Sequence, residues 1–236
     1  MGPSAIRHAG LHERLRSLGY VTEDAGNVDI PERATLAAHP DRSFMSAVVD
    51  GCSAAYDAGA QAITDDRFPI FLGGDHSMAA GTVGGVSAAD PIGLLWIDAH
   101  ADANTPETSP TGNIHGMPLA ALMGLGAPSL VNVGRPGPKI PFARIALIGL
   151  RDVDAGERLL LRDHGVAAYT MTDVDEYGAG DIARRALTHL SGIEHLHVSL
   201  DMDVVDPLEA PGVGTPVPGG LTYREARRDR RIRRPR

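Results

Sequence analysis

The sequence predicts an α/β protein with a mainly parallel sheet. Short apolar runs at 92–97, 144–150 and 195–200 read as buried strands. Segments with helical periodicity and glycine stop signals lie between these runs. Strands that alternate with helices form parallel sheets whose two faces are both covered by helices. Acidic side chains follow two of the strands, where ligands bind in open α/β sheets.

The remaining elements follow from periodicity, from stop signals and from length. In chain order, we predict an amphipathic helix over 3–18 ended by Gly19, a helix over 43–58 ended by Gly59, a strand over 68–72, a small-residue helix after Ser77, helices near 155–164 and 179–190 with a short strand between them, and the start of a helix over 219–226. The segment from Ala99 to His115 is too long for a plain connector and is therefore predicted to be functional.

Composition narrows the class of protein. A length of 236 residues suits one α/β domain, which we assign to 1–226. The lone Cys52 provides no internal disulfide and no thiolate metal site. No apolar run approaches the ~20 residues that span a bilayer, and the first residues lack the apolar core of a signal peptide. These features predict a cytoplasmic protein without a membrane partner.

Charge is distributed unevenly along the chain. The net charge is −8, although eight arginines fall in the last 13 positions. The body is therefore clearly acidic, which argues against nucleic acid as a partner. We interpret 227–236 as a disordered or aberrant basic tail; the alternative is a basic arm that binds nucleic acid or an acidic surface.

Five potential metal ligands stand at alternate positions after two predicted strands. Asp98, His100 and Asp102 follow the strand over 92–97, and Asp201 and Asp203 follow the strand over 195–200. Side chains at alternate positions of an extended segment point to one face. Four carboxylates that converge repel one another unless a cation neutralises them. The spacing therefore predicts bound metal.

His76 can supply a sixth ligand. It follows Gly73, Gly74 and Asp75 at the end of a predicted strand, and the glycines permit a tight turn there. Carboxylates suit Mg²⁺, Ca²⁺ or Mn²⁺, whereas imidazoles suit Mn²⁺, iron, Co²⁺ or Zn²⁺, so the combined set favours Mn²⁺. Six ligands can hold two ions, the arrangement that activates a water molecule near neutral pH.

Four motifs resemble the ureohydrolases, and specifically the arginases. They are GGDHS at 73–77, WIDAHADANTP at 96–106, GNIHGMP at 112–118 and SLDMDVVDP at 199–207. The resemblance runs in order from Gly2 to about Ala226. It implies a three-layer α/β/α fold, two Mn²⁺ ions, hydrolysis of L-arginine to L-ornithine and urea, and a homo-oligomer that is a trimer or a hexamer.

The resemblance also implies roles for individual residues. Six residues would hold the ions: His76, Asp98, His100, Asp102, Asp201 and Asp203. Asp102 would also accept a hydrogen bond from the bridging hydroxide, and His115 would act as proton shuttle or general acid. The substrate would be recognised by Asn104, Thr111, Asn113, Asp154, Glu157 and Thr215. Thr111 stands where the family usually has serine. We interpret Arg151 and Asp152 as an ion pair that braces the loop of Asp154.

Two alternatives stay open. Known arginases begin with a strand before the segment Met-Gly-Pro-Ser and continue past residue 226 with a glutamate that pairs with the substrate guanidinium and with subunit contacts. We therefore expect a chain that lacks terminal elements, and one alternative is an inactive, truncated metal-binding fragment. The other is an agmatinase or a related guanidino-compound ureohydrolase. The loop over 104–115 and Asp154 favour the amino-acid substrate, because agmatine has no carboxylate to bind.

Overall fold

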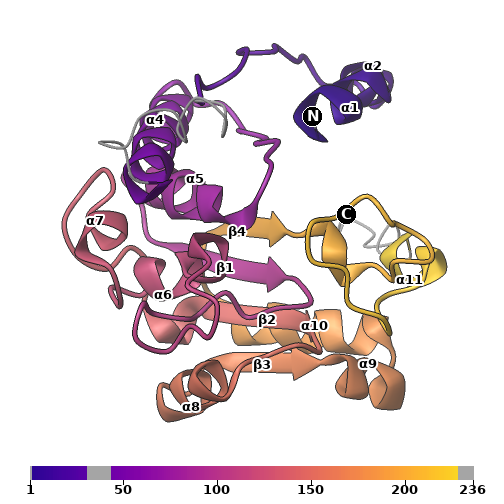
Figure 1. The fold of residues 1–236 in the computed structure, drawn as a ribbon. Coiled ribbons are helices and arrows are strands. Elements are labelled where there is room, and N and C mark those ends of the chain that lie inside the picture. The colour runs from indigo at the N-terminus through magenta and orange to yellow at the C-terminus, as the bar shows by residue number, and fades with distance from the viewer. Residues whose placement is uncertain (1, 31–43, 228–236) are drawn as a thin grey trace.

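The computed structural model describes residues 2–30 and 44–227 (Figure 1). Residue 1 and the ranges 31–43 and 228–236 lie outside the described residues. The predicted basic tail is therefore outside them except for Arg227, which ends a short helix, α11 (Tyr223–Arg227). The first residue of the helix predicted over 43–58 also lies outside.

Four parallel strands form the central sheet. They are β1 (Ile92–Ile97), β2 (Ile145–Leu150), β3 (Ala167–Thr170) and β4 (His195–Leu200). Their order is β3-β2-β1-β4, so β1 pairs with β2 on one side and with β4 on the other. All four carboxyl ends lie at the same edge of the sheet (Figure 1). The predictions of strands at 92–97, 144–150 and 195–200 are confirmed.

Helices cover both faces of this sheet. On one face, Leu94 and Trp96 of β1 pack with residues of α5 (Ala79–Val86), α6 (Pro118–Leu122) and α8 (Ala155–Asp163). On the other face, Leu95 of β1 and Ile148 of β2 pack with α9 (Met171–Tyr177) and α10 (Ala179–His189). Alternate side chains of one strand thus enter two different cores. The predicted three-layer α/β/α fold is confirmed.

Close helix packing explains the small residues of α5. The long helix α4 (Phe44–Thr64) lies against α5 in Figure 1. A Cβ atom on Gly81 would lie 2.0 Å from the backbone carbonyl oxygen of Cys52, and one on Gly85 would lie 2.2 Å from that of Tyr56. Both positions therefore need a residue without a side chain.

The prediction that α4 ends at Gly59 is wrong. Gly59 lies inside the helix, where a Cβ would already contact Phe71 Cζ at 3.3 Å. This glycine therefore provides room and not a stop signal.

The helix predicted over 3–18 is divided. The structure has α1 (Gly2–His8) and α2 (Leu11–Ser17), and Gly10 between them has a φ of 87°. Such a left-handed conformation interrupts a right-handed helix, and glycine adopts it without steric cost.

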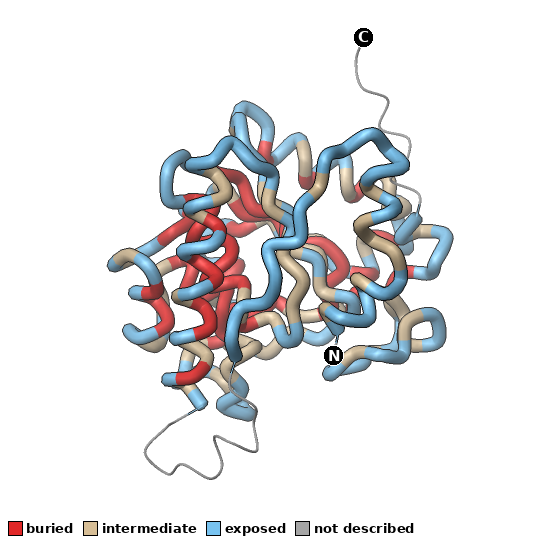
Figure 2. Tube along the Cα trace, turned by 90° about the horizontal axis from the view of Figure 1, so that it is seen from above, coloured by how far each residue is buried: buried red, intermediate tan, exposed pale blue. Residues whose placement is uncertain are grey.

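The strand predicted over 68–72 is also not formed, since no part of this segment joins the sheet. Phe68 remains 87% exposed there. A strand requires a partner, and this segment has none among the described residues. Among the described residues, β3 and β4 are the two edge strands of the sheet, and in β4 the side chains of Leu196 and Val198 are 40% and 51% exposed. Figure 2 shows that buried residues gather around the sheet and the helices that cover it, whereas the N-terminal segment is largely exposed.

The remaining elements are short. They are α7 (Pro128–Val131) and the 3₁₀ turns η1 (His76–Met78), η2 (Ile114–Gly116), η3 (Phe142–Arg144) and η4 (Met202–Val204). Within the ranges 2–30 and 44–227, none of the helices has the length and apolar character needed to cross a membrane.

Candidate metal centre

The end of β1 positions the first ligand by a backbone hydrogen bond. The N–H of Asp98 donates to the carbonyl of Ile148 in β2 at 3.0 Å, and the carboxylate is buried. Beyond this point the extended alternation that we predicted does not continue. The chain bends, and Asp102 adopts a left-handed φ of 51°. A non-glycine residue in this region carries strain that clusters at functional sites. The turn, and not the pleat of a strand, therefore directs Asp102 inward.

The end of β4 positions Asp201 and Asp203 differently. The N–H of Asp201 donates to the carbonyl of Ile97 at 2.9 Å, which continues the ladder with β1. The carboxylate of Asp201 accepts a hydrogen bond from the N–H of Asp203 at 3.0 Å and so caps η4. One tight turn therefore presents both carboxylates at the same edge of the sheet.

His76 approaches from the other side of the cluster. It begins η1, which Asp75 caps by accepting hydrogen bonds from the backbone N–H and the hydroxyl of Ser77. The imidazole of His76 stacks on the indole of Trp96 with the ring centroids 4.0 Å apart. Its Nε2 atom lies 2.8 Å from the hydroxyl of Ser199. The ring is thus oriented before any ligand binds.

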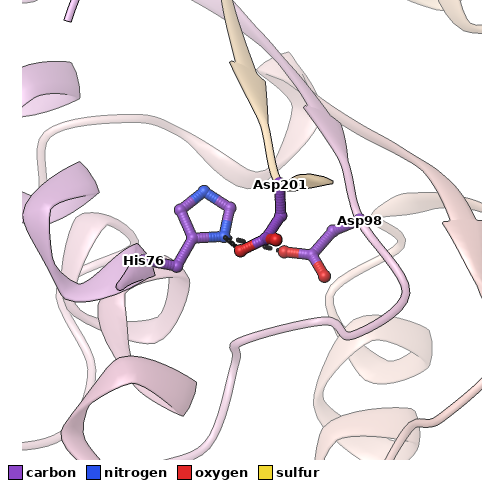
Figure 3. Close-up of side chains that lie close together, drawn as sticks. All are labelled: His76, Asp98 and Asp201. Carbon is purple, nitrogen blue, oxygen red and sulfur yellow. Dashed lines mark hydrogen bonds and ion pairs between the residues drawn. The ribbon is translucent and has the colours of Figure 1, made fainter. Parts of the chain in front are cut away.

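The six predicted ligands converge. Nδ1 of His76 lies 2.8 Å from an oxygen of Asp98, 3.0 Å from one of Asp102 and 3.3 Å from one of Asp201. Figure 3 shows His76 facing Asp98 and Asp201. Nδ1 of His100 lies 3.5 Å from the other oxygen of Asp98 and 3.0 Å from Asp203. The residues form two groups that could each hold a metal ion: His76–Asp98–Asp201 and Asp98–His100–Asp203. The two groups share Asp98.

The electrostatics of the cluster suit a cation. Although burial alone lowers the pKa of His76, hydrogen bonds to Asp102 and Asp98 raise it to about 10. Asp203 and Asp98 raise the pKa of His100 to about 11. Burial, together with the charge of Asp98, raises the pKa of Asp102 to about 7 despite the opposing effect of His76. In the metal-free protein, protons on two imidazoles therefore offset the carboxylates. Metal ions bind neutral imidazole, so they would replace these protons.

Two of the predicted substrate residues contact each other beside this cluster. Asn104 is buried, and its Nδ2 donates to Asp154 at 2.8 Å. Asp154 is the N-cap of α8, and Glu157 completes its capping box. The two carboxylate oxygens of Glu157 accept hydrogen bonds from the N–H groups of Asp154 at 2.9 Å and Ala103 at 2.8 Å. Glu157 thus joins α8 to the loop after β1, and its contact with substrate stays a prediction.

The other predicted substrate residues lie on loops. Thr111 and Asn113 are exposed, and the N–H of Asn113 donates to the hydroxyl of Thr111 at 3.2 Å. His115 is half-buried in η2. Within the described ranges, no hydrogen bond joins these three residues to the cluster. The hydroxyl of Thr215 does reach it, since it donates to Asp203 at 3.1 Å.

Sequence reasoning missed three residues that contact the ligands. The indole N–H of Trp96 donates to Asp98 at 3.0 Å, and Ser199 contacts His76. Each lies two positions before a ligand, so the same alternation could have found them. The third is Arg151, whose guanidinium donates to the carbonyl oxygen of Asp203. The predicted ion pair between Arg151 and Asp152 is not formed among the described residues, because Asp152 points toward Nε2 of His100 at 3.8 Å.

Comparison with known proteins identifies the family. A model described as the arginase family matches residues 1–231. The chain belongs to the arginase family. It is 46% identical to the arginase of Bacillus caldovelox over 96% of this chain and 77% of that protein. For the arginase of Bacillus subtilis the identity is 44%, over 96% of this chain and 76% of that protein. The chain thus spans about three-quarters of the length of these arginases.

Solved arginase structures agree with the fold. The native arginase from Bacillus caldovelox superposes with a TM-score of 0.90 at 45% identity, over 96% of this chain and 77% of that one. The Entamoeba histolytica arginase in complex with L-ornithine gives a TM-score of 0.84 at 31% identity, over 95% and 76%. Membership of the arginase family makes this chain an amidine hydrolase. Its two His/Asp groups are compatible with a binuclear metal site.

Proposed function

We propose that this chain hydrolyses L-arginine to L-ornithine and urea with two Mn²⁺ ions. The observation that carries the proposal is the convergence of two imidazoles and four carboxylates at the carboxyl ends of β1 and β4, in a member of the arginase family. Both groups combine carboxylate oxygen with imidazole nitrogen, the donor set that favours Mn²⁺.

The chain's own residues divide into two sets. Those that would hold the ions are His76, Asp98, His100, Asp102, Asp201 and Asp203. When bound, such a pair of ions acts as a Lewis acid and makes water a stronger nucleophile. Asp102 would also accept a hydrogen bond from the attacking water. Its inward position, imposed by the left-handed turn, supports this role.

The second set would bind the amino-acid end of the substrate. We propose that the carboxylate of Asp154, already fixed by Asn104, pairs with the α-ammonium group. The substrate carboxylate would be bound by Asn104 and by Thr111 and Asn113 of the exposed loop, and Glu157 and Thr215 would complete this site.

His115 would deliver the proton that the leaving amine requires. As water adds to the guanidinium carbon and the carbon–nitrogen bond breaks, the nitrogen that becomes the side-chain amine of ornithine takes up this proton. An imidazole suits this step because its ordinary pKa lies near neutral pH. The homo-oligomeric state and the cytoplasmic location stay predictions.

Urea release by the manganese-loaded chain tests the proposal. We expect turnover of L-arginine and at most weak turnover of agmatine, which has no carboxylate for Asn104 and Thr111 to bind. Asp102→Ala serves as the background. Preference for agmatine would assign a different guanidino compound as the substrate. Uptake of two ions with no urea from either compound would reduce the chain to a metal-binding protein without hydrolase activity.

A further inference from the structure

Arg151 connects the ends of three strands. It follows β2 directly, and its backbone N–H donates to the carbonyl of Ala99, in the loop after β1, at 2.9 Å. Its side chain extends toward the segment after β4. The main chain and the side chain of one residue therefore bind the two loops that carry the metal ligands.

The guanidinium of Arg151 binds backbone carbonyls and no carboxylate within the described part of the chain. Nη2 donates at 2.6 Å to the carbonyl oxygens of both Asp203 and Val217, and Nε donates to Val217 at 3.1 Å. Longer contacts reach Val204 and Gly149 at 3.3 and 3.4 Å and Pro218 at 3.3 Å. We name this arrangement the Arg151 clamp: Arg151 with the carbonyls of Gly149, Asp203, Val204, Val217 and Pro218.

The clamp joins two stretches that are distant in the sequence. Nη2 bridges the carbonyl of Asp203, in the turn after β4, and the carbonyl of Val217, fourteen positions later in the chain. Between these points, Thr215 donates its hydroxyl to the carboxylate of Asp203. The packing around the clamp is tight, since a Cβ on Gly220 would lie 2.7 Å from Nη2. The loop is therefore closed around Asp203, which fixes both its backbone and its carboxylate.

The group Asp98–His100–Asp203 depends on the clamp, whereas the group His76–Asp98–Asp201 does not. Asp201 is held by the sheet, because its N–H donates to Ile97 of β1. Asp98, which both groups share, is held by β2 in the same way. Asp203 lies beyond the ladder, in η4, where its backbone carbonyl is bound by Arg151. Removal of the clamp should therefore affect one group and spare the other.

We infer that Arg151 is a positioning residue that fixes the segment 203–218 and thereby builds the ion site formed by Asp98, His100 and Asp203. The inference rests on the proposed pair of metal ions. It assigns Arg151 no contact with the substrate. Partners that orient metal ligands typically change metal affinity by about 10- to 100-fold when they are removed.

Manganese titration of the metal-free chain tests the inference. By calorimetry, we expect two ions for the wild type. For Arg151→Met, which keeps the length of the side chain and removes its donors, we expect one ion at wild-type affinity and a second weakened by about tenfold or more. Arg151→Lys keeps the charge but has a single donor nitrogen. Its affinity for the second ion should therefore lie between those of the wild type and Arg151→Met.

Arg135→Met provides a matched control. Arg135 is also half-buried and donates to backbone carbonyls, those of Pro138 and Lys139 at 3.0 and 3.3 Å, but none of these belongs to the metal centre. This variant should bind two ions as the wild type does. Electron paramagnetic resonance gives an independent signature, because the exchange-coupled spectrum of a manganese pair should give way to that of an isolated ion in Arg151→Met alone.

Each remaining outcome is decisive. Two ions with unchanged affinity in Arg151→Met would overturn the inference and leave the proposed function intact. Loss of both ions to the same extent in Arg151→Met and Arg151→Lys would also overturn it, since Arg151 would then support the whole fold. A wild type that takes up no manganese would overturn the proposed metal centre itself, and the inference with it.

Discussion

The strands β1 and β4 both end in candidate metal ligands, yet one strand is buried and the other is largely exposed. In β1, five of the six residues are buried, and strands lie on both sides. In β4, Leu196, Val198 and Leu200 are 40%, 51% and 56% exposed, and one edge has no partner among the described residues. The cluster of ligands nevertheless forms between them. Backbone hydrogen bonds to the sheet hold both Asp98 and Asp201, but the β1 half of the site also has a buried core behind it, whereas the β4 half relies on the Arg151 clamp.

The largest expected effect is the loss of metal binding, which should differ between substitution of Asp98 after β1 and substitution of Asp201 after β4. Asp98 of the β1 end belongs to both ion-binding groups, whereas Asp201 of the β4 end belongs to one. Asp98→Asn should therefore abolish binding of both ions and lower urea release at least ~10³-fold, about 4 kcal/mol of barrier. Asp201→Asn should retain one ion. The exposed Asp57→Asn is the control. Equal ion counts in the first two variants would contradict the shared role of Asp98.

A matched pair of core substitutions measures the difference in packing. Leu94→Ala, at a fully buried site of β1, should lower the free energy of unfolding by about 3–4 kcal/mol, since it removes packed atoms and leaves a cavity. Leu196→Ala, at a half-exposed site of β4, should cost about 1 kcal/mol. Urea denaturation of the metal-free proteins provides both values. Similar costs would show that β4 is covered as well as β1 in solution.

The next effect is a loss of folding stability at acidic pH that is caused by His197 in β4. Burial lowers the pKa of His197 to about 4. In the unfolded chain the pKa of this histidine is about 6.5. Above pH 6.5 the imidazole is neutral in both states, so its burial does not reduce the stability of the fold. Below pH 6.5 the unfolded chain takes up a proton that the folded protein excludes, and the folded state becomes less stable. This loss develops as the pH falls from about 6.5 to 4, and it amounts to at most about 3 kcal/mol. His197→Gln removes this group.

The difference between wild type and His197→Gln isolates the effect from other titrations. Asp102, whose pKa is raised to about 7 in the folded protein, gives stability the opposite pH dependence throughout this range, but it is present in both proteins. We expect the wild type to lose stability relative to the variant between pH 6.5 and 4, as measured by chemical denaturation with a chelator present. Parallel pH profiles of the two proteins would show that His197 is solvated.

The smallest effect concerns the polar contacts that support the β4 half of the site. Thr215→Val removes the hydroxyl that donates to Asp203 and keeps the shape of the side chain. We expect the second manganese ion to bind about tenfold more weakly. Thr215→Ser keeps the hydroxyl and should bind both ions as the wild type does. If the serine variant were weakened as much as the valine variant, the methyl group and not the hydrogen bond would matter.

The convergence of the candidate ligands was predictable because short-range rules determine where these side chains lie. Asp98 and Asp201 each follow an apolar run of strand length, and parallel strands bring such ends together. Their chemistry then indicated metal without reference to the fold. The predicted alternation also placed His100, Asp102 and Asp203 in the cluster, although the structure uses turns to do so.

The errors arise where distant contacts determine the outcome. Gly59 resembles a stop signal, but it lies inside α4, where a Cβ would lie only 3.3 Å from both Phe71 Cζ and the backbone nitrogen of Val86 in α5. The segment 68–72 has the composition of a strand, yet a strand exists only with a hydrogen-bonded neighbour. Arg151 was paired with the nearest carboxylate in sequence, whereas its partners are backbone carbonyls up to 67 positions away. Carbonyl acceptors have no signature in the sequence, since every residue has one.

The stacking of Trp96 on His76 should make metal binding at the candidate site directly observable. The protein contains one tryptophan, and its indole contacts both a candidate imidazole ligand and the shared carboxylate of Asp98. Its fluorescence therefore arises entirely from this cluster. Because the indole stacks on the His76 ring and donates to Asp98, replacement of the proton on His76 by a metal ion should change the intensity of this emission. The chain thus carries its own optical reporter of metal occupancy, without any label.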